Sequence, residues 1–599
     1  MYLKICPRAR LAFMMFFIFC ASLYAEPAAV AAAQTGGAQV AVSRADYDAD
    51  YAVPPGTRIR NIHIQRDDLF DSSKSAGYQE LSLYDRQRYI LAYPVIANAF
   101  HWLTLESTIR RDLLYTEGDV YRQDLIDESE RILRDTKRLI VGATRVVPVT
   151  DEAPDNKTGW VDVYIYTQDV WSLYFNIDGK TSGGLFLFTF MFGERNLFGR
   201  GISAELGLNH DNFFTRWWLQ FDQPRLLQSH WRFFGRTRFH YDTEGDHVGE
   251  LVQLMLQRPL FSRSEKWGWQ TMFTYENTPV IKHEGKDIKQ VEVAPGVFRD
   301  RKYHNKYFTL ENMLVRSFGY TNKLNIGAFI RNEQYVYHAN PDLEPEYEEA
   351  FRQKAMKDDY TRHKAGVMLS ANNHRWMRIS GFRTFGRVED FAQGSSLKME
   401  LSASQKFFGS DENAMYLAAH FTNNTISGGH IIQPRASFTS DFVAGAGQRN
   451  MIATLQYLHH IRTVPLGTLS FRAEATFGER LDADSYLSLG ADTGLRGYVS
   501  DRFEGNRLVL FSAEYRFDPL PFIRNPYVSF VAFGDLGSCW YTGERSLKDI
   551  RLYPGAGIGI RASIPSINPD IIRFDIATNF GNDTTSLGSI FTFTYGHIF

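Results

Sequence analysis

Residues 466–477 read LGTLSFRAEATF, and hydrophobic and polar side chains alternate along them. The apolar positions are Leu469, Phe471, Ala473, Ala475 and Phe477. The polar positions are Thr468, Ser470, Arg472, Glu474 and Thr476. A period of two residues is typical of a β-strand with two unlike faces, so this stretch predicts such a strand. PGAGIGIRASI (554–564) and IIRFDIATNF (571–580) repeat the same pattern.

Strands of this kind continue from about residue 171 onward, and they are too many and too similar for one β-sandwich core. A closed barrel with lipid outside and polar residues inside explains the same alternation. Aromatic residues make up 15% of the chain, and beyond residue 25 no apolar run reaches the ~18 residues of a membrane-spanning helix. Only helices and closed barrels satisfy every backbone group inside a bilayer. The sequence therefore predicts an all-β transmembrane barrel over residues 171–599.

The first 25 residues have the composition of a secretory signal peptide. Lys4, Arg8 and Arg10 precede or begin the apolar stretch LAFMMFFIFCASLY, and Ala25 ends the expected cleavage site. Residues 26–54 are rich in alanine, glycine and valine without periodicity, which favours a flexible linker. An exported chain with barrel strands is expected in a cell outer membrane.

Charge and cysteine content exclude several classes of protein. Removing the signal takes away three cations and no acid, so the formal net charge falls from −2 to −5, without the basic surface that nucleic acid requires. Cys539 is the one cysteine outside the signal, so no intrachain disulfide is expected. The sequence contains no GxSxG, HExxH or paired CxxC motif. We therefore expect no enzyme, no cofactor and no metal site.

Residues 55–170 predict a small α/β domain ahead of the barrel. TRIRNIHIQ is a strand pattern, and Leu105, Ile109 and Leu113 recur at the helical spacing i, i+4, i+8. The inward face of a second helix is expected at Ile126, Ser129, Ile132 and Leu133. IVGATRVVPV and WVDVYIYTQD then read as two strands, which gives the order β-α-α-β-β. Residues 70–100 fit this order less well and are interpreted as an insertion.

A second set of motifs lies near the end of the barrel segment. GLRGY (494–498) occupies an unpatterned stretch, about residues 479–505, between two alternating segments. LVLFSAEYRF (508–517) carries Glu514, and FGDLG (533–537) carries Asp535. Together these motifs resemble the BamA/TamA-type outer-membrane assembly and translocation proteins. In that superfamily, a long extracellular loop with an arginine-glycine-aromatic motif folds into the barrel.

The resemblance implies a latch inside the barrel. The expected latch residues are Arg496, Gly497 and Tyr498, their lumen partners are Glu514 and Asp535, and the supporting motif residues are Phe533 and Gly537. Counting faces agrees, because Phe511 and Phe530 point to lipid and both carboxylates therefore point into the lumen. The planar donor fork of arginine suits bidentate bonding to such carboxylates.

The resemblance also implies about 16 antiparallel strands and identifies residues 55–170 as one polypeptide-transport-associated (POTRA) domain in the periplasm. The last strand, FTFTYGHIF, fits the terminal strand of such a barrel. Its aromatic face is formed by Phe591, Phe593, Tyr595 and Phe599. It is expected to close the barrel against the first strand, WSLYFNIDG (171–179). Residues 281–305 and 338–360 are interpreted as extended loops.

The leading functional hypothesis is an outer-membrane insertase or translocase for other polypeptides. An exposed sheet edge in the α/β domain would capture an unfolded client as an added strand and pass it to a weak barrel seam. The partners are then the outer-membrane bilayer and unfolded outer-membrane or secreted polypeptides, with periplasmic accessory proteins left open. Three alternatives remain: a dedicated secretion translocator for one passenger protein, a passive pore or structural barrel, and a soluble all-β binding protein.

Overall fold

The computed structural model describes most of the chain from residue 53 onward. The described ranges are 53–67, 101–135, 139–141, 145–148, 159–182, 185–284, 287–385, 388–482, 485–521, 527–543, 550–564, 568–580 and 590–595. The predicted signal, nearly all of the predicted linker and the predicted insertion lie outside them. Among the described residues, no helix is long and apolar enough to cross a membrane. Asp50 to Phe599 form one compact unit, so the domain boundary at residue 170 stays a prediction.

The first part of this unit is a small α/β arrangement with one more strand than expected. Its elements are β1 (Arg58–Asp67), α4 (Glu106–Asp112), α5 (Gln123–Asp135), β2 (Leu139–Val141), β3 (Arg145–Pro148) and β4 (Trp160–Asp169). β1 pairs parallel with β4, and both β2 and β3 pair antiparallel with β4. The single strand predicted over residues 140–149 is therefore two short strands, because both halves pair with different parts of β4.

The two helices pack their apolar faces on this sheet. The buried core contains Ile59, Ile109, Ile126, Leu133 and Val163. Of the predicted positions in α5, Ile126, Ser129 and Leu133 are buried, and Ile132 is half-buried. Leu105, however, is exposed, because α4 begins only at Glu106 and Leu105 is its N-cap in extended conformation. The prediction that Leu105 belongs to the inward helix face was wrong.

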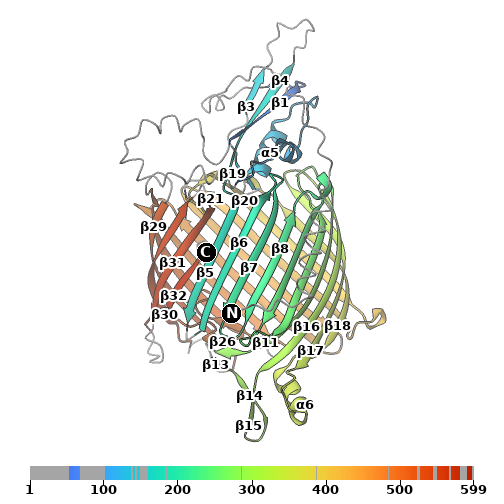
Figure 1. Cartoon of the computed structure of the whole chain (residues 1–599), viewed down its shortest axis with the longest axis vertical. Helices are drawn as coiled ribbons and strands as arrows, with labels where there is room; N and C mark the ends of the chain where they lie inside the picture. Colours follow the sequence, from blue (N-terminus) through green and yellow to red (C-terminus); the bar gives the residue numbers. More distant parts are fainter. Residues whose placement is uncertain are drawn as a thin grey trace. The chain divides into compact units, whose positions relative to one another are not determined.

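The remaining strands pair in a closed circuit in which β32 returns to β5 (Figure 1). Within the described residues the circuit contains 22 strands, of which β19 and β28 are short continuations of their predecessors. The expected number of about 16 is therefore too low. Short turns between residues 173 and 281 let this stretch alone carry seven strands, β5 to β11.

The strands of the circuit are β5 (Leu173–Ser182), β6 (Leu185–Leu197), β7 (Ile202–Asp211), β8 (Thr215–Gln223), β9 (Arg232–Tyr241), β10 (His247–Arg258), β11 (Trp267–Ile281), β16 (Lys302–Phe318), β17 (Lys323–Ala339), β18 (Tyr360–Asn372), β19 (Arg375–Ser380), β20 (Val388–Ser404), β21 (Ala414–Ser427), β22 (His430–Val443), β23 (Gly447–Ile461), β24 (Gly467–Glu479), β27 (Arg507–Phe517), β28 (Leu520–Pro521), β29 (Tyr527–Trp540), β30 (Tyr553–Ile564), β31 (Asn568–Asn579) and β32 (Ile590–Tyr595). Short 3₁₀ turns, η3 (Leu226–Gln228) and η4 (Lys406–Phe408), lie between strands.

Apolar side chains cover the outside of the circuit, and polar side chains line its inside. In β24, Phe471 and Phe477 are exposed, whereas Ser470 beside Phe471 is fully buried. In β30, Ile558 is 66% exposed while Arg561 is 0% exposed. This distribution is the reverse of that in a water-soluble sheet and fits a wall that faces lipid. The alternation predicted from residues 466–477 and 554–564 is confirmed in these strands.

The stretches interpreted as extended loops contain ordered elements. β12 (His283–Glu284) pairs with β13 (Asp287–Ile288), and β14 (Gln290–Ala294) pairs with β15 (Val297–Asp300). The helix α6 (Pro345–Ala355) lies within the stretch 338–360 (Figure 1). β14, β15 and α6 share a small core with the ends of β16 and β17, and it contains Val293, Tyr303, Tyr337, Phe351 and Met356. The pattern analysis missed it because each element is short and its few apolar residues come from distant parts of the chain.

The turn after β6 binds the segment that leads into α4. The side-chain amide of Asn196 donates to the Trp102 carbonyl at 2.9 Å and to Thr104 Oγ1 at 2.9 Å. The Gly199 carbonyl accepts a backbone hydrogen bond from Leu105 at 2.9 Å. Gly199 has φ +70°, and a Cβ there would lie 2.4 Å from the Leu103 carbonyl oxygen. This turn therefore depends on a residue without a side chain.

We expect Ile126→Ala to weaken the α/β core by about 2–4 kcal/mol, because it leaves a cavity among fully buried side chains. Hydrogen–deuterium exchange of the whole protein should then show faster exchange in β1 and β4 and unchanged exchange in the barrel strands. Leu105→Ala is the matched control, since Leu105 is exposed. Equal protection of β1 in both variants would contradict this description of the core.

Candidate functional site

The segment between β24 and β27 turns back and packs on the inner face of the barrel. It contains two short paired strands, β25 (Leu487–Leu489) and β26 (Phe503–Gly505). A buried cluster joins it to the wall; its members are Leu489, Leu495, Tyr498, Leu508, Leu510 and Cys539. Leu508 and Leu510 belong to β27 and Cys539 to β29, so these two strands form the floor on which the segment lies.

Arg496 lies at the centre of this contact and is 4% exposed. Its Nε and Nη2 donate to the two oxygens of Asp535 at 2.7 and 2.8 Å. Its Nη1 donates to Oε1 of Glu514 at 2.6 Å, and its backbone N–H donates to Asp535 at 3.2 Å. One arginine thus joins the loop to β27 and β29 through four hydrogen bonds, three of them from its side chain.

Of the two supporting motif residues, Phe533 lies directly beside this arginine. The guanidinium carbon of Arg496 lies 3.5 Å from the ring centroid of Phe533, a distance suited to a cation–π contact. Gly537, farther along β29, faces Leu489 of the loop, and a Cβ at Gly537 would lie 2.9 Å from Leu489 Cδ2. Phe533 and Gly537 therefore shape the wall under the loop.

Two glycines allow the loop backbone to touch the wall. Gly497 has φ +93°, and a Cβ there would lie 2.5 Å from the Thr578 carbonyl oxygen. A Cβ on Gly555 of β30 would lie 2.1 Å from the Arg496 carbonyl oxygen. The Gly497 carbonyl also accepts a hydrogen bond from the Asn579 amide at 3.0 Å. Side chains at either glycine would push the loop away from the wall.

Tyr498 completes the expected trio and is buried. Its hydroxyl donates to the Pro554 carbonyl at 2.9 Å. Its ring lies 5.4 Å from Phe503 of β26 and 6.1 Å from Tyr553 of β30, measured between centroids. The structure therefore places Tyr498 between the loop and β30, where it fills space and satisfies a backbone carbonyl.

Sequence reasoning missed further charged residues in this cluster. Arg561 Nη1 donates to Asp575 at 2.6 Å, and Arg516 Nε donates to Glu514 at 2.8 Å. Asp575 also lies 4.0 Å from Arg496 and 3.5 Å from Arg573. Face counting places Arg561, Arg573 and Asp575 on polar faces, but it does not give the register that brings them together across β30 and β31.

The charges of this cluster stabilise one another in the absence of bulk water. Burial alone would lower the pKa of Arg496, but its hydrogen bonds to Asp535 and the charges of Asp535, Glu514 and Asp575 raise that pKa above its usual value. Removing one partner of a buried ion pair typically costs about 3–5 kcal/mol, because the remaining charge is left without its counter-charge. The arginine and its carboxylates therefore form one unit.

The outer end of the loop is held by the elements that were interpreted as extended loops. Lys289 forms an ion pair with Glu504 of β26. The amines of Lys282 and Lys289 lie 5.2 and 5.7 Å from the ring centroid of Tyr486. Lys357 Nζ donates to Ser485 Oγ at 3.2 Å. The loop is thus bound at both ends, by the wall inside and by these lysines outside.

The predicted terminal strand is present as β32. It contains Phe591, Phe593 and Tyr595, whereas Phe599 lies outside the described residues. β32 pairs with β31 over six positions but with β5 over three, from Phe591–Thr181 to Phe593–Gly179. The first strand, expected at 171–179, runs from Leu173 to Ser182 as β5.

Among the described residues, no group of three or more potential metal ligands is found.

Comparison with known proteins identifies the family. A sequence profile of the Omp85 superfamily domain matches residues 196–599, more than half of the chain. No curated protein matches the chain in sequence. BamA from Haemophilus ducreyi lacking POTRA domains 1-3 is similar in structure, with 15% identity, coverage of 90% of this chain and 84% of that one, and a TM-score of 0.35.

Two structures of CdiB are also similar. CdiB from Acinetobacter baumannii has 10% identity, covers 98% of this chain and 97% of its own, and gives a TM-score of 0.40. CdiB from Escherichia coli has 11% identity, covers 100% of both chains and gives a TM-score of 0.41. Because these TM-scores are below 0.5, the family rests on the sequence profile.

We expect Gly555→Ala to displace the loop from the wall, because its new Cβ would lie 2.1 Å from the Arg496 carbonyl oxygen. Overpacking of about 1–3 kcal/mol should raise trypsin cleavage after Arg496 by roughly tenfold. Gly534→Ala is the control, since the nearest atom to a Cβ there is the Gly555 carbonyl oxygen at 3.9 Å. Mass spectrometry of the digests measures both, and equal cleavage in the two variants would contradict the proposed close contact.

Proposed function

This chain belongs to the Omp85 superfamily, and we propose that it acts as an outer-membrane insertase or translocase for other polypeptides. The barrel would span the outer membrane, where members of this superfamily handle polypeptide clients. The α/β unit would be a POTRA domain in the periplasm that receives the client first.

The short seam between β32 and β5 is the observation that carries this proposal. Within the described residues the two strands pair over three positions, whereas β5 and β6 pair over ten, from Leu173–Glu194 to Ser182–Leu185. The ladder ends at Phe593 and Gly179, although β32 continues to Tyr595 and β5 begins at Leu173. A ladder with few hydrogen bonds separates more readily than the rest of the wall, and a separated strand edge accepts a client strand.

The arginine cluster lies close to this seam in the strand order. Arg496 contacts β29 through Asp535, and Arg561 of β30 contacts Asp575 of β31. Asp575 is the register partner of Thr592 in β32. We propose that the latch stiffens β29 to β31 and so leaves the motion of the seam to β32 and β5.

The sheet of the α/β unit offers a place for the client before it reaches the barrel. β1 lies at one edge, but the Asp119 carbonyl accepts a hydrogen bond from the Ile59 N–H at 2.9 Å, and Gly118 N–H donates to Ile59 O at 2.8 Å. The backbone of residues 118–119 thus covers part of that edge. We therefore place client capture on the opposite edge, formed by β2 and β3.

A disulfide across the seam should abolish client handling without unfolding the barrel. Gly179 and Phe593 are register partners, so the pair Gly179→Cys and Phe593→Cys can lock the seam. Asn176→Cys with Met191→Cys is the control, because it links β5 to β6 within the wall. Assembly or secretion of clients should stop on oxidation of the seam pair, return on reduction, and continue in the control. Full activity with a verified seam disulfide would contradict the proposal.

Photo-crosslinking inside cells then separates insertase from translocator. A photoreactive residue at Phe175, which is exposed on the outer face of β5, should give adducts with several β-barrel proteins if the protein is an insertase. A single large secreted partner would instead make it a dedicated translocator. Phe442, exposed on β22 away from the seam, is the control. Equal adduct patterns from both positions would contradict client entry at the seam.

A further inference from the structure

The turn between β20 and β21 presents two neighbouring phenylalanines that the proposed function does not use. Phe407 is 89% exposed and Phe408 is 66% exposed, and both belong to η4. Their ring centroids lie 5.1 Å apart with the planes nearly perpendicular. Two adjacent, exposed aromatic rings on one short turn are costly in water, so the turn needs a covering environment.

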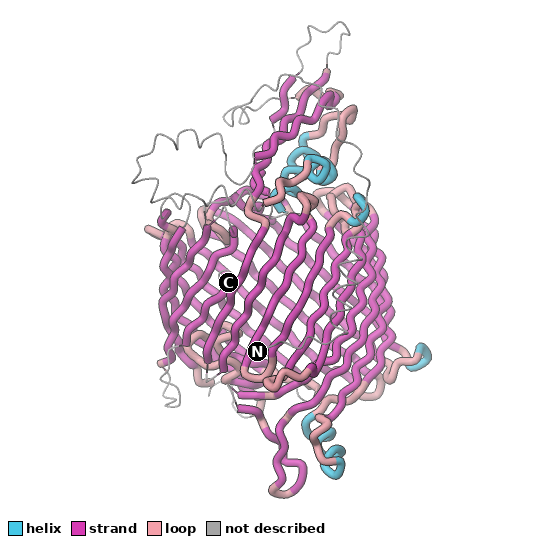
Figure 2. Tube along the Cα trace, in the orientation of Figure 1, coloured by secondary structure: helices cyan, strands magenta, loops and turns pink. Residues whose placement is uncertain are grey.

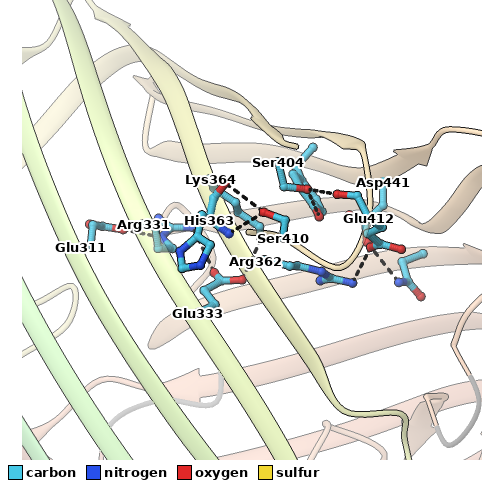
Figure 3. A network of polar contacts seen from close by, with 12 residues as sticks. Glu311, Arg331, Glu333, Arg362, His363, Lys364, Ser404, Ser410, Glu412 and Asp441 are labelled. Carbon is cyan, nitrogen blue, oxygen red and sulfur yellow. Dashed lines mark hydrogen bonds and ion pairs between the residues drawn. The ribbon is translucent and has the colours of Figure 1, made fainter. Parts of the chain in front are cut away.

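The turn is fixed in place by hydrogen bonds beneath the rings, which Figure 3 shows in part. Ser410 Oγ accepts from the His363 N–H of β18 at 2.9 Å. Glu412 accepts from Arg362 of β18 at 3.0 Å and from Arg449 of β23 at 2.6 Å. The side chain of Asn413 accepts from the Lys406 N–H at 2.7 Å. The backbone that carries the two rings is therefore held by two strands, β18 and β23, and by a bond within the turn itself.

The rings continue the apolar exterior of the barrel. Among the exposed large apolar residues of β20 and β21, Leu401 and Met415 lie nearest to the turn. In Figure 2 a short helical turn projects sideways from the barrel wall, rather than into its interior. Lys406 stands beside the rings and is also exposed, so the turn combines an apolar tip with a cation.

We propose that Phe407 and Phe408 insert into the boundary between headgroups and acyl chains of the outer-membrane leaflet that faces away from the α/β unit. This proposal rests on the membrane placement of the barrel given above. Aromatic tips next to a basic side chain bind at such boundaries, because the rings leave water while the cation stays near anionic headgroups. The molecules that cover the two rings are lipids, since the tip is continuous with the lipid-facing wall.

The position of this turn gives the anchor a mechanical role. In the circuit, β20 and β21 lie about half-way round from the seam between β32 and β5. An anchor there holds the wall opposite the seam at a fixed depth in the bilayer. Movements of the seam strands would then deform the bilayer on the seam side alone, and the barrel as a whole would not tilt.

The test is a nitroxide label at Phe407→Cys, read by power-saturation electron paramagnetic resonance in vesicles of phosphatidylethanolamine and phosphatidylglycerol. Cys539 is buried and stays in place. Phe298→Cys, on β15 at the same end of the barrel and also exposed, is the matched control. We expect the collision ratio of oxygen to a water-soluble nickel complex to be several-fold higher at position 407 than at position 298.

Two results would overturn the proposal. Equal ratios at the two positions would place the turn in water. Low collision rates with both reagents at position 407 would mean that protein covers it, as a second copy or another partner would. The label measurement involves no client, so its result is independent of the seam-disulfide experiment. Failure of the membrane-anchor proposal can therefore be told apart from failure of the proposed function.

Discussion

The contact of Arg496 with Asp535 and Glu514 is the interaction on which the interior of this barrel depends. It holds a long loop against the inner face of the barrel wall. The guanidinium charge of Arg496 would be costly to bury without these carboxylates. Gly497 and Gly555 permit the close approach of the loop backbone to β30 and β31 that accompanies this contact. Tyr498 and the apolar cluster around Leu495 fill the space between the loop and the barrel wall.

The same contact lies, in strand order, near the ladder between β32 and β5, which pairs over three positions among the described residues. Arg496 pairs with Asp535 of β29 and lies 4.0 Å from Asp575 of β31, which also accepts from Arg561 of β30. β31 is the strand that pairs with β32. Beyond β32, the hydrogen-bonded ladder to β5 is short. Under the proposed function, the stiffened strands β29 to β31 would leave deformation to this ladder. The proposed anchor at Phe407 and Phe408 would hold the opposite side of the circuit.

Which side chains face the lumen was largely predictable from the alternation of apolar and polar residues along single strands. Face counting placed Glu514 and Asp535 in the lumen, and in the structure both contact Arg496. Contacts that depend on the register between neighbouring strands were not predictable. Asp575 and Arg561 meet through strand register, which the sequence of either strand does not contain. The number of strands was not predicted, because short turns leave no periodic signal. The elements β14, β15 and α6 were not predicted either, because their core is assembled from residues far apart in the sequence. Leu105 shows the smaller error, in which a helical spacing extended one residue beyond the true helix start.

The central claim is that Arg496 and Asp535 act as one buried unit inside the barrel. A double-mutant cycle with Arg496→Met and Asp535→Leu, measured by urea unfolding of the protein in phospholipid vesicles, tests it most directly. We expect the losses of stability in the two single variants to be non-additive, with a coupling free energy of about 2 kcal/mol or more. Additive effects, with a coupling close to zero, would show that the two side chains do not stabilise each other and would contradict the account.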